Sequence, residues 1–498
     1  MELQFQKREI ACLRNLLSQP QTVEQTQEVR IPENLPGAAR ILGAWGQPVM
    51  RSKEWMGGSI QLSGGVLVWA LYDPEDGSQP RCLNSWIPFQ LRWDLSDGTA
   101  EGQVRCLPLL RSVDARLVSA GKIMIRVGIS ALAEAWAEES CQVFRPESVP
   151  EDLELLQQTY PVRLPRVIGE KPFTMEEELT LPSSAPKMEQ LVYYRMEPMV
   201  SDRKVMGNRL VFRGTGNLHL LYLSGDGQLY GWDYDLPFSQ FADLQESGSS
   251  DAQADILLSP TQLELELDPE GKLQLRAGMT AQYLVDDREV LELTEDAYSP
   301  RREMTIQQEQ LRLPAQLDSR RENIYGELTI PIQADVVADV SFLPDFPRQR
   351  REGDEITLEQ PGMLQLLYYD GEGKLQSAGH RWEGTHKLKA DEDTRLLAVP
   401  LGTAAQLMPG GENMILRGEV PVQMMASGGS GINMVTGVTL GQLRQPDPGR
   451  PSLILRRAGD SSLWSIARES GSTVASIQAA NGLQGEPAPE QMLLIPVV

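Results

Sequence analysis

The segment RAGDSSLWSIARESGSTVASIQAANGLQGEPAPEQMLLIP, residues 457–496, decides the fold of the last part of the chain. Ser462 favours a helix start, because its hydroxyl can accept a hydrogen bond from a backbone N–H that the first helical turn leaves unpaired. Gly471 favours the helix end, since glycine adopts the left-handed conformation of a helix stop without strain. The apolar residues between these points recur at i, i+3 and i+4, and they are Leu463, Ile466 and Ala467.

A second helix follows the first after a short turn. Thr473 can cap its start, and Asn481-Gly482 can end it, because both residues tolerate a positive φ. Short apolar strands flank the helix pair, and they are Leu453 to Leu455 and Met492 to Ile495. Residues 451–498 are therefore predicted to form a small α+β domain in the order strand, helix, helix, strand.

This arrangement resembles the LysM domain. The matching residues are Gly459-Asp460, Leu463-Trp464-Ser465-Ile466-Ala467, Val474, Ile477, Asn481-Gly482-Leu483, Pro489-Glu490-Gln491 and Leu494-Ile495-Pro496. The resemblance implies that the two strands pair antiparallel with both helices on one face. It also implies a shallow groove that binds N-acetylglucosamine-containing glycans such as peptidoglycan or chitin.

The groove residues are carried over from the family by position. One wall, before the first helix, is expected to be Gly459, Asp460, Ser461, Ser462 and Leu463, and the other, after the second helix, Asn481, Gly482, Leu483 and Gln484. Short Gly, Ser and Asn residues let a ligand approach backbone N–H and C=O groups. The same residue types also cap helices, so both roles stay open here.

The first 449 residues contain an internal repeat. A short strand ends in proline at Pro32, Pro182 and Pro331, and a second apolar strand ends in tyrosine at Tyr72, Tyr222 and Tyr368. Both markers keep the same order and nearly the same period. This indicates three copies of one domain. We expect the copies at residues 1–145, 160–300 and 303–445.

Each copy is predicted to consist of antiparallel, sandwich-like β structure. Leu263, Leu265 and Leu267 alternate with polar residues, a turn follows at Asp268 to Gly271, and Leu273 and Leu275 alternate on the return. This pattern is typical of a hairpin with one apolar face. The best candidate for an amphipathic helix is Glu151 to Thr159, between copies one and two.

Three β repeats followed by one C-terminal LysM domain resemble the SPOCS-domain sporulation proteins of spore-forming Firmicutes, including those of the stage VI sporulation protein D type. The resemblance covers essentially the whole chain. It implies a protein of the mother cell that helps coat layers encase the forespore. It also implies that the LysM domain contacts a coat morphogenetic protein, the ATPase known as stage IV sporulation protein A.

Charge and composition limit the other partners. The formal net charge of the 498 residues is −23, whereas residues 450–498 hold four basic and four acidic residues. The acidic excess therefore lies in the repeats, and it would repel nucleic acids and anionic membranes. No membrane span is expected, because no apolar run is long enough.

Targeting signals and cysteines favour a cytoplasmic protein. The first residues, MELQFQKREIACLRNLL, contain no apolar run of the kind that a signal peptide needs. Cys12, Cys82, Cys106 and Cys141 lack CxxC spacing, which favours a reducing compartment over a disulfide scaffold.

Few residues favour catalysis, so we expect no enzyme, no cofactor and no metal. His219 lies within a strand pattern, which favours a packed or edge histidine. His380 and His386 flank Trp382, and no cysteine or acidic cluster gives them the spacing of metal ligands. Trp464 is expected in the core of the LysM domain, with a sugar-stacking platform as the alternative.

A peptidoglycan-binding protein that tethers the repeats to cell wall or cortex remains the alternative function.

Overall fold

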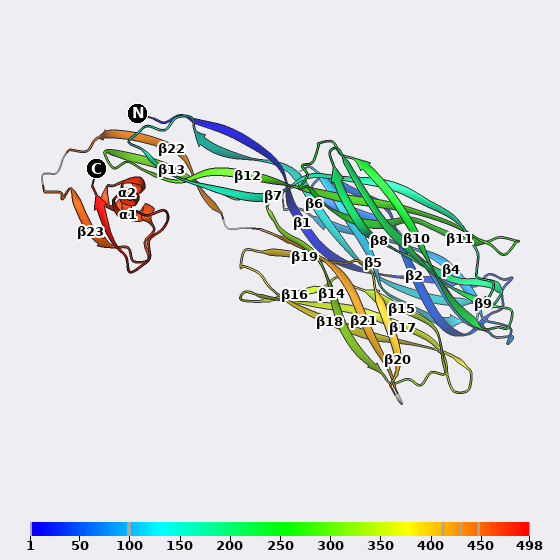
Figure 1. The fold of residues 1–498 in the computed structure, drawn as a ribbon. Coiled ribbons are helices and arrows are strands. Elements are labelled where there is room, and N and C mark those ends of the chain that lie inside the picture. The colour runs from blue at the N-terminus through cyan, green and yellow to red at the C-terminus, as the bar shows by residue number, and fades with distance from the viewer. Residues whose placement is uncertain (1, 97–100, 411–412, 429–430, 446–448, 498) are drawn as a thin grey trace.

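The computed structural model describes residues 2–96, 101–410, 413–428, 431–445 and 449–497. Strands make up 73% of the chain and helices 3%, which confirms the prediction of a mainly β protein. Within the described residues, the paired strands run antiparallel. They form a wide body that narrows into a stalk, and the helical C-terminal domain lies at the stalk's end (Figure 1).

The first set of strands builds two facing sheets. Its strands are β1 (Phe5–Arg30), β2 (Ala38–Met56), β3 (Ser59–Pro74), β4 (Arg81–Asp94), β5 (Gln103–Ser119) and β6 (Lys122–Pro146). One sheet has the order β1-β6-β5 and the other the order β2-β3-β4. Alternating apolar residues of both sheets meet in one core, as in a β-sandwich.

The second set repeats this topology. Its strands are β7 (Glu154–Leu179), β8 (Met188–Met206), β9 (Arg209–Ser224), β10 (Leu229–Asp243), β11 (Gln253–Leu267) and β12 (Leu273–Tyr298). The sheets are β11-β12-β7 and β10-β9-β8, so the first strand again pairs with the last. The predicted hairpin is confirmed, because Leu265 pairs with Leu275 and Leu267 with Leu273 across the turn.

The third set follows the same plan with interrupted strands. Its strands are β13 (Arg302–Leu311), β14 (Gln316–Ile330), β15 (Val336–Pro344), β16 (Arg348–Glu352), β17 (Glu355–Tyr369), β18 (Leu375–Lys389), β19 (Arg395–Pro400), β20 (Ala404–Gly410), β21 (Asn413–Ser427) and β22 (Ile432–Leu443). β15 and β16 pair with successive parts of β17, and β19 and β20 with successive parts of β21. The repeat boundaries stay a prediction, and β7 already begins at Glu154, before residue 160.

The tyrosine markers have a structural role in the first two sets. Tyr72 donates a hydrogen bond to the carbonyl oxygen of Pro36, and Tyr222 donates one to that of Pro186, each at 3.1 Å. Both tyrosines are fully buried. Each therefore anchors the loop that follows the marker proline to the middle strand of the second sheet.

The segment expected as a helix, Glu151 to Thr159, is instead a turn followed from Glu154 by the start of β7, so that prediction is wrong. Glu154 pairs with Tyr298 and Thr159 with Glu292 on β12. The polar pattern of this segment is compatible with an exposed helix. Pairing with β12 satisfies the backbone hydrogen bonds along one edge of this segment. This tertiary contact outweighs the weak local preference for a helix.

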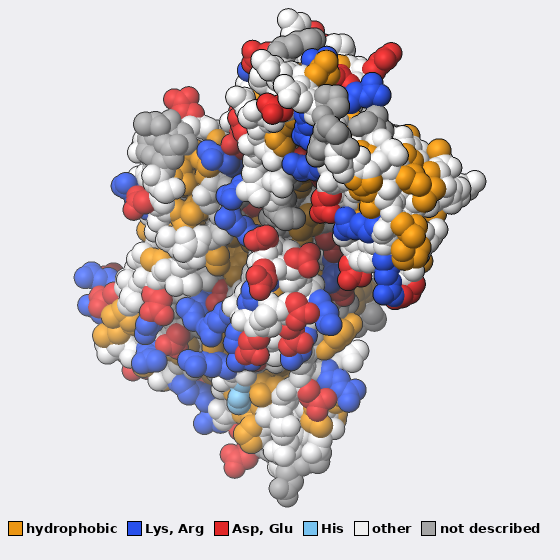
Figure 2. All heavy atoms as spheres, turned by 90° about the vertical axis from the view of Figure 1, so that its left-hand side faces the viewer, with side chains coloured by type: hydrophobic (Ala, Val, Ile, Leu, Met, Phe, Trp, Pro, Cys, Tyr) orange, Lys and Arg blue, Asp and Glu red, His pale blue; other side chains and the backbone are white. Residues whose placement is uncertain are grey.

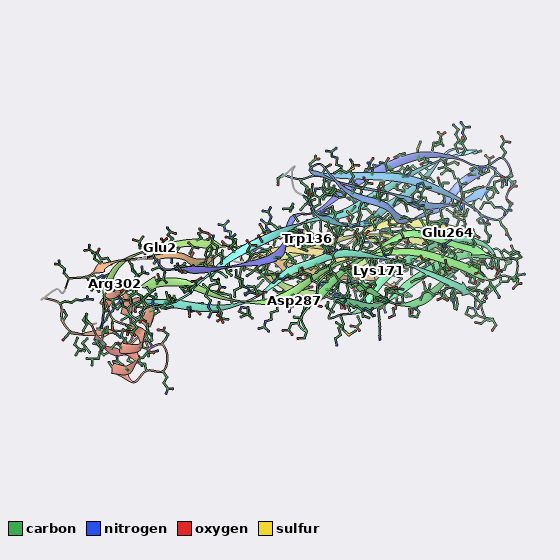
Figure 3. The ribbon with its side chains drawn as sticks, turned by 90° about the horizontal axis from the view of Figure 1, so that it is seen from above. Glu2, Trp136, Lys171, Glu264, Asp287 and Arg302 are labelled. Carbon is green, nitrogen blue, oxygen red and sulfur yellow. The ribbon has the colours of Figure 1, made fainter. Side chains whose placement is uncertain are left out.

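The stalk contains three strand pairs, one from each set, which we call ribbons: the ends of β1 with β6 and of β7 with β12, and β13 with β22. Their apolar residues share common cores, which include Ile10, Cys12, Val143, Leu164, Leu291, Leu293, Leu311 and Met434. Leu3 N–H donates to the Val438 carbonyl at 2.9 Å, which joins the first residues to β22. Glu2 and Arg302 mark this narrow end in Figure 3, whereas Lys171 and Glu264 lie in the body.

Buried polar groups also join the sets in the body. The guanidinium of Arg105 lies 2.6 Å from a carboxylate oxygen of Glu134 and 2.9 Å from one of Asp255 in the second set. The side-chain amide of Gln282 accepts from the backbone N–H of Cys106 and donates to its carbonyl. Elsewhere, Trp45 of the first set stacks on Tyr193 of the second, with ring centroids 4.6 Å apart.

The C-terminal domain has the predicted order. It consists of β23 (Leu453–Arg457), α1 (Leu463–Ser470), α2 (Val474–Asn481) and β24 (Met492–Pro496), with the two strands antiparallel. Ser462 and Thr473 cap the helices through their hydroxyls, and Gly471 and Gly482 end them in the left-handed conformation. The periodic apolar residues Leu463, Ile466 and Ala467 are buried together with Ile477, Leu493 and Ile495.

Candidate binding site

The first predicted groove wall is the loop from β23 into α1. Gly459 has a φ of +62° and nothing within 4 Å of where a Cβ would stand, so this point of the wall is open. Ser462 accepts from the backbone N–H of Ser465 at 3.2 Å and is therefore engaged as the cap of α1. Leu463 is 2% exposed and belongs to the core. Gly459, Asp460 and Ser462 are exposed and Ser461 is partly exposed, so Leu463 alone of the five predicted residues of this wall is buried.

The second predicted wall begins with Asn481, whose side chain is fully engaged. Its amide nitrogen donates to the carbonyls of Ile477 at 2.8 Å and Leu494 at 2.7 Å. Its amide oxygen accepts from the backbone N–H of Leu494 at 2.8 Å. Asn481 therefore joins the end of α2 to β24. Gly482 and Gln484 are exposed, while Leu483 packs against the domain core.

A residue outside the predicted set connects the two walls. The carboxylate of Glu486, in the loop after α2, accepts from the backbone N–H of Leu463 at 2.8 Å. A carboxylate at the start of a helix satisfies an unpaired donor and interacts favourably with the helix dipole. The chain itself thus occupies one of the N–H groups at the start of α1. Sequence patterns missed Glu486 because it is remote from α1 in the chain.

Trp464 points away from the groove and toward the stalk. Its ring packs edge-on against Tyr298 of β12, with centroids 4.7 Å apart, and its indole N–H donates to Asp296 at 2.8 Å. Arg468 also pairs with Asp296, at 2.5 Å, and the hydroxyl of Tyr298 donates to the Ser472 carbonyl. These bonds therefore attach the LysM-like helices to β12. Trp464 contributes to the contact between the C-terminal domain and the second set.

Two family models match parts of the chain. Residues 187–266 match the SipL, SPOCS domain model, and residues 457–496 match the LysM domain model. This chain carries a SPOCS domain and a LysM domain. The SPOCS match covers β8, β9, β10 and nearly all of β11, in the second set. No curated protein and no solved structure matches the chain.

Both domain families are non-catalytic, and together they fit a sporulation protein with a module of the peptidoglycan-binding class. Among the residues that the structure describes, no helix is long and apolar enough to cross a membrane. The comparisons thus support the SPOCS and LysM resemblance, and they leave the individual groove residues as predictions.

The LysM sheet exposes an apolar outer face. Leu453 is 50% exposed, Leu455 66%, Met492 52% and Leu494 36%, and they alternate with residues that face the helices. Leu455 pairs with Leu494, whereas Leu453 lies opposite Pro496 and Met492 opposite Arg457, so the four side chains form a diagonal patch across the two strands. We call these four residues the outer sheet face. In Figure 2, hydrophobic side chains gather on the lobe at the right, where the LysM domain lies.

The histidine in the SPOCS region is part of an ion-pair bridge. His219 Nδ1 lies 2.6 Å from Asp233, and Nε2 lies 2.8 Å from the buried Asp339 of the third set. Burial opposes protonation of His219, but the hydrogen bonds to the two aspartates outweigh it and raise the pKa to about 9. The structure therefore places His219 in a contact between two sets, which is a packing role.

A group of possible metal ligands, Cys12, Glu139 and Cys141, lies in the stalk. The two Sγ atoms are 4.0 Å apart within an apolar core. Burial raises the pKa of the Cys12 thiol to about 12, which favours the protonated form that does not bind metals. Sequence spacing missed the group, because its members meet only when β1 pairs with β6.

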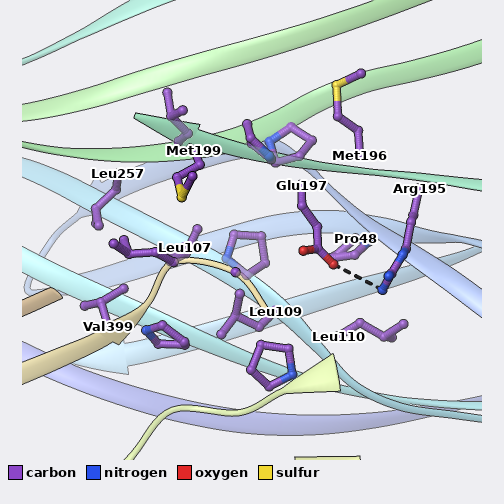
Figure 4. Close-up of a pocket in the computed structure, with 18 of the residues that line it drawn as sticks. Pro48, Leu107, Leu109, Leu110, Arg195, Met196, Glu197, Met199, Leu257 and Val399 are labelled. Atoms are coloured by element: carbon purple, nitrogen blue, oxygen red, sulfur yellow. Dashed lines mark ion pairs between the residues drawn. The ribbon is translucent and has the colours of Figure 1, made fainter. Parts of the chain in front are cut away.

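The body also has a partly open pocket of about 140 Å³ where strands of all three sets approach one another (Figure 4). Its wall is largely aliphatic and includes Pro48, Leu109 and Met199. The ion pair between Arg195 and Glu197, at 3.1 Å, lies on one side. Among the residues that line it, no histidine, cysteine or hydroxyl group is present for catalysis.

Proposed function

We propose that this protein is a non-enzymatic scaffold for assembly of the spore coat. It acts in the mother cell at the forespore surface, and its LysM domain recruits a coat morphogenetic protein, an ATPase of the stage IV sporulation protein A type. The SPOCS and LysM matches in one chain support the sporulation role. The state of the groove supports a protein partner.

The observation that carries this preference is the hydrogen bond between Glu486 and Leu463 N–H across the groove. A glycan lies in such a groove by bonding to exposed backbone groups of the two walls. Here Glu486 already occupies the Leu463 N–H of the first wall, and the side-chain amide of Asn481 in the second wall is itself bonded to Ile477 and Leu494. A sugar would have to displace a charge-assisted hydrogen bond, which is stronger than a neutral one.

The charge of the protein supports the same preference. The net charge is −23, and the four acidic residues of residues 450–498 are balanced by four basic ones. An acidic body disfavours close approach to anionic wall polymers, although salt screens this repulsion beyond roughly 8–10 Å. A protein partner with its own apolar or basic surface meets no such cost.

The test measures how tightly the full chain binds each of the two ligands. Binding to the purified ATPase from the same organism would be measured by biolayer interferometry, and binding to chitin oligomers by calorimetry. We expect micromolar or tighter binding to the ATPase and millimolar or no binding to the oligomers. Micromolar binding to chitin without binding to the ATPase would contradict the proposal.

The alternative function is a peptidoglycan-binding protein that tethers the β repeats to cell wall or cortex. The LysM match favours it, as do Gly459 and Gly482, which leave open space on each wall. Under this alternative, the exposed Gln484 lines the sugar site. A Gln484→Trp variant would then lose binding to muropeptides while keeping its binding to the ATPase.

A further inference from the structure

We propose that the LysM domain recruits its protein partner through the outer sheet face and not through the groove, and that the partner covers this face with a short amphipathic helix. This inference rests on the proposed function and assigns the surface that performs it. The face consists of Leu453, Leu455, Met492 and Leu494, which are 36% to 66% exposed.

Two other surfaces of the domain are already partly engaged. The α1 side packs on β12 through Trp464, Tyr298 and Asp296. The groove contains the bond from Leu463 to Glu486. The outer sheet face, in contrast, is an unpartnered surface that gathers four large aliphatic side chains within one small domain. Large aliphatic side chains that cluster on an exposed surface, in contrast to ones scattered singly, are candidates for an interaction site.

The dimensions of the face fit one helix. Each strand has five residues, which span about 17 Å, and the two strands lie about 5 Å apart. A helix is about 10 Å wide with its side chains, and three turns span about 16 Å. Apolar residues at i, i+3, i+4 and i+7 of such a helix would lie along the line between β23 and β24, over the Leu455–Leu494 pair at its centre and Leu453 and Met492 at its opposite ends.

A second copy of this chain is a poorer occupant. Two such faces together would bury less than the roughly 1,200 Å² that stable interfaces need. Face-to-face contact would also bring two bodies with a net charge of −23 each toward one another. Arg457 lies at the end of the outer sheet face, on the same side of β23 as Leu453 and Leu455. It pairs with Glu490. A helix from another protein avoids the repulsion and can add contacts beyond the face.

The experiment uses the full chain and the purified ATPase. Two variants change the face, Met492→Glu and Leu455→Glu. Met206→Glu is the matched control, because Met206 in β8 is also 52% exposed but lies in the SPOCS domain. Gln484→Trp blocks the groove. Because all four positions are exposed, folding should persist, and thermal unfolding and tryptophan fluorescence would verify it.

We expect Met492→Glu and Leu455→Glu to weaken binding at least tenfold, and Met206→Glu and Gln484→Trp to change it less than twofold. In methyl NMR of methionine-labelled protein, the Met492 signal should shift on complex formation. Normal binding by the face variants with loss in Gln484→Trp would overturn this inference and leave the proposed function intact.

Two further outcomes are decisive. If the wild type does not bind the ATPase, the proposed function fails and this inference fails with it. If sedimentation shows a wild-type dimer at micromolar concentration that Met492→Glu abolishes, the face is a contact between copies, and the inference is wrong.

Discussion

At the scale of single residues, this protein uses buried polar side chains to fix its loops and its contacts between sets. Tyr72 and Tyr222 hold equivalent loops, and His219 bridges two aspartates from different strands. Such groups are stable inside a protein only when their hydrogen bonds are satisfied. Removing one partner therefore has a predictable cost.

The tyrosine anchors can be tested by removing one oxygen. Tyr72→Phe and Tyr222→Phe should each lower the free energy of unfolding by about 1 kcal/mol, because the hydrogen bond to Pro36 or Pro186 is lost. Chemical denaturation would measure the loss. Tyr325→Phe is the control, since Tyr325 is 63% exposed and should unfold like the wild type.

The His219 bridge predicts a dependence of stability on pH. Its pKa is raised to about 9 in the folded protein, above the roughly 6.5 of the unfolded chain, so folding favours the protonated form. The stabilisation is fully present below pH 6.5 and is lost as the pH rises through about 9. Melting temperatures from pH 6 to 9.5 should therefore fall more steeply in the wild type than in His219→Gln. Parallel curves would contradict this.

At the scale of elements, the end of β12 determines where the LysM domain lies. Asp296 accepts from Trp464 and pairs with Arg468, and Tyr298 packs on the same indole. These contacts lie on one short stretch of strand beyond the sandwich of the second set. The LysM domain is therefore positioned by a side-chain contact in addition to its covalent linker.

Asp296→Ala should release the LysM domain without unfolding it. The indole of Trp464 and the guanidinium of Arg468 would both lose their partner on β12. We expect faster proteolysis between β22 and β23 and a shifted Trp464 emission. Glu292→Ala is the control, because Glu292 also lies on β12 but pairs with the exposed Arg145. Unchanged proteolysis in Asp296→Ala would show that the linker alone positions the domain.

Local signals were sufficient to predict the elements of the LysM domain, and remote contacts were not. Ser462 and Gly471 determine the ends of α1 through their own capping bonds, so they could be read from sequence. Glu486 and Asp296 contact α1 from distant segments, and no periodicity indicates such contacts. The segment at Glu154 failed for the same reason, because its partner strand lies more than a hundred residues away.

At the scale of the whole molecule, three sandwiches meet through buried charges and apolar strands. The Arg105 cluster is a buried ion-pair contact of this kind: its side chain is 1% exposed, that of Glu134 2% and that of Asp255 5%. Burial opposes the charge on Arg105, but the two carboxylates outweigh it and raise the pKa of the guanidinium. The cluster joins the first and second sets.

Breaking this cluster should uncouple the sets. Arg105→Met leaves two buried carboxylates without their cation, and such a loss costs about 3–5 kcal/mol. Calorimetry should show a lower first transition. The triple change to Arg105→Met, Glu134→Leu and Asp255→Leu removes all three charges and should recover most of that loss. No difference between the single and the triple variant would contradict the electrostatic account.

The connection of Leu3 to Val438 has a consequence for the order of events during synthesis. When β1 has emerged from the ribosome, its partner strand β6 has not yet been synthesised, because β6 begins at Lys122. The end of the first ribbon that lies next to Leu3 lacks its partner for still longer, until β22 has emerged. Pairing between such distant segments is slow, and unpaired strands are prone to aggregate in the interval. A nascent chain of this protein should therefore depend on chaperones until nearly all of it has been translated.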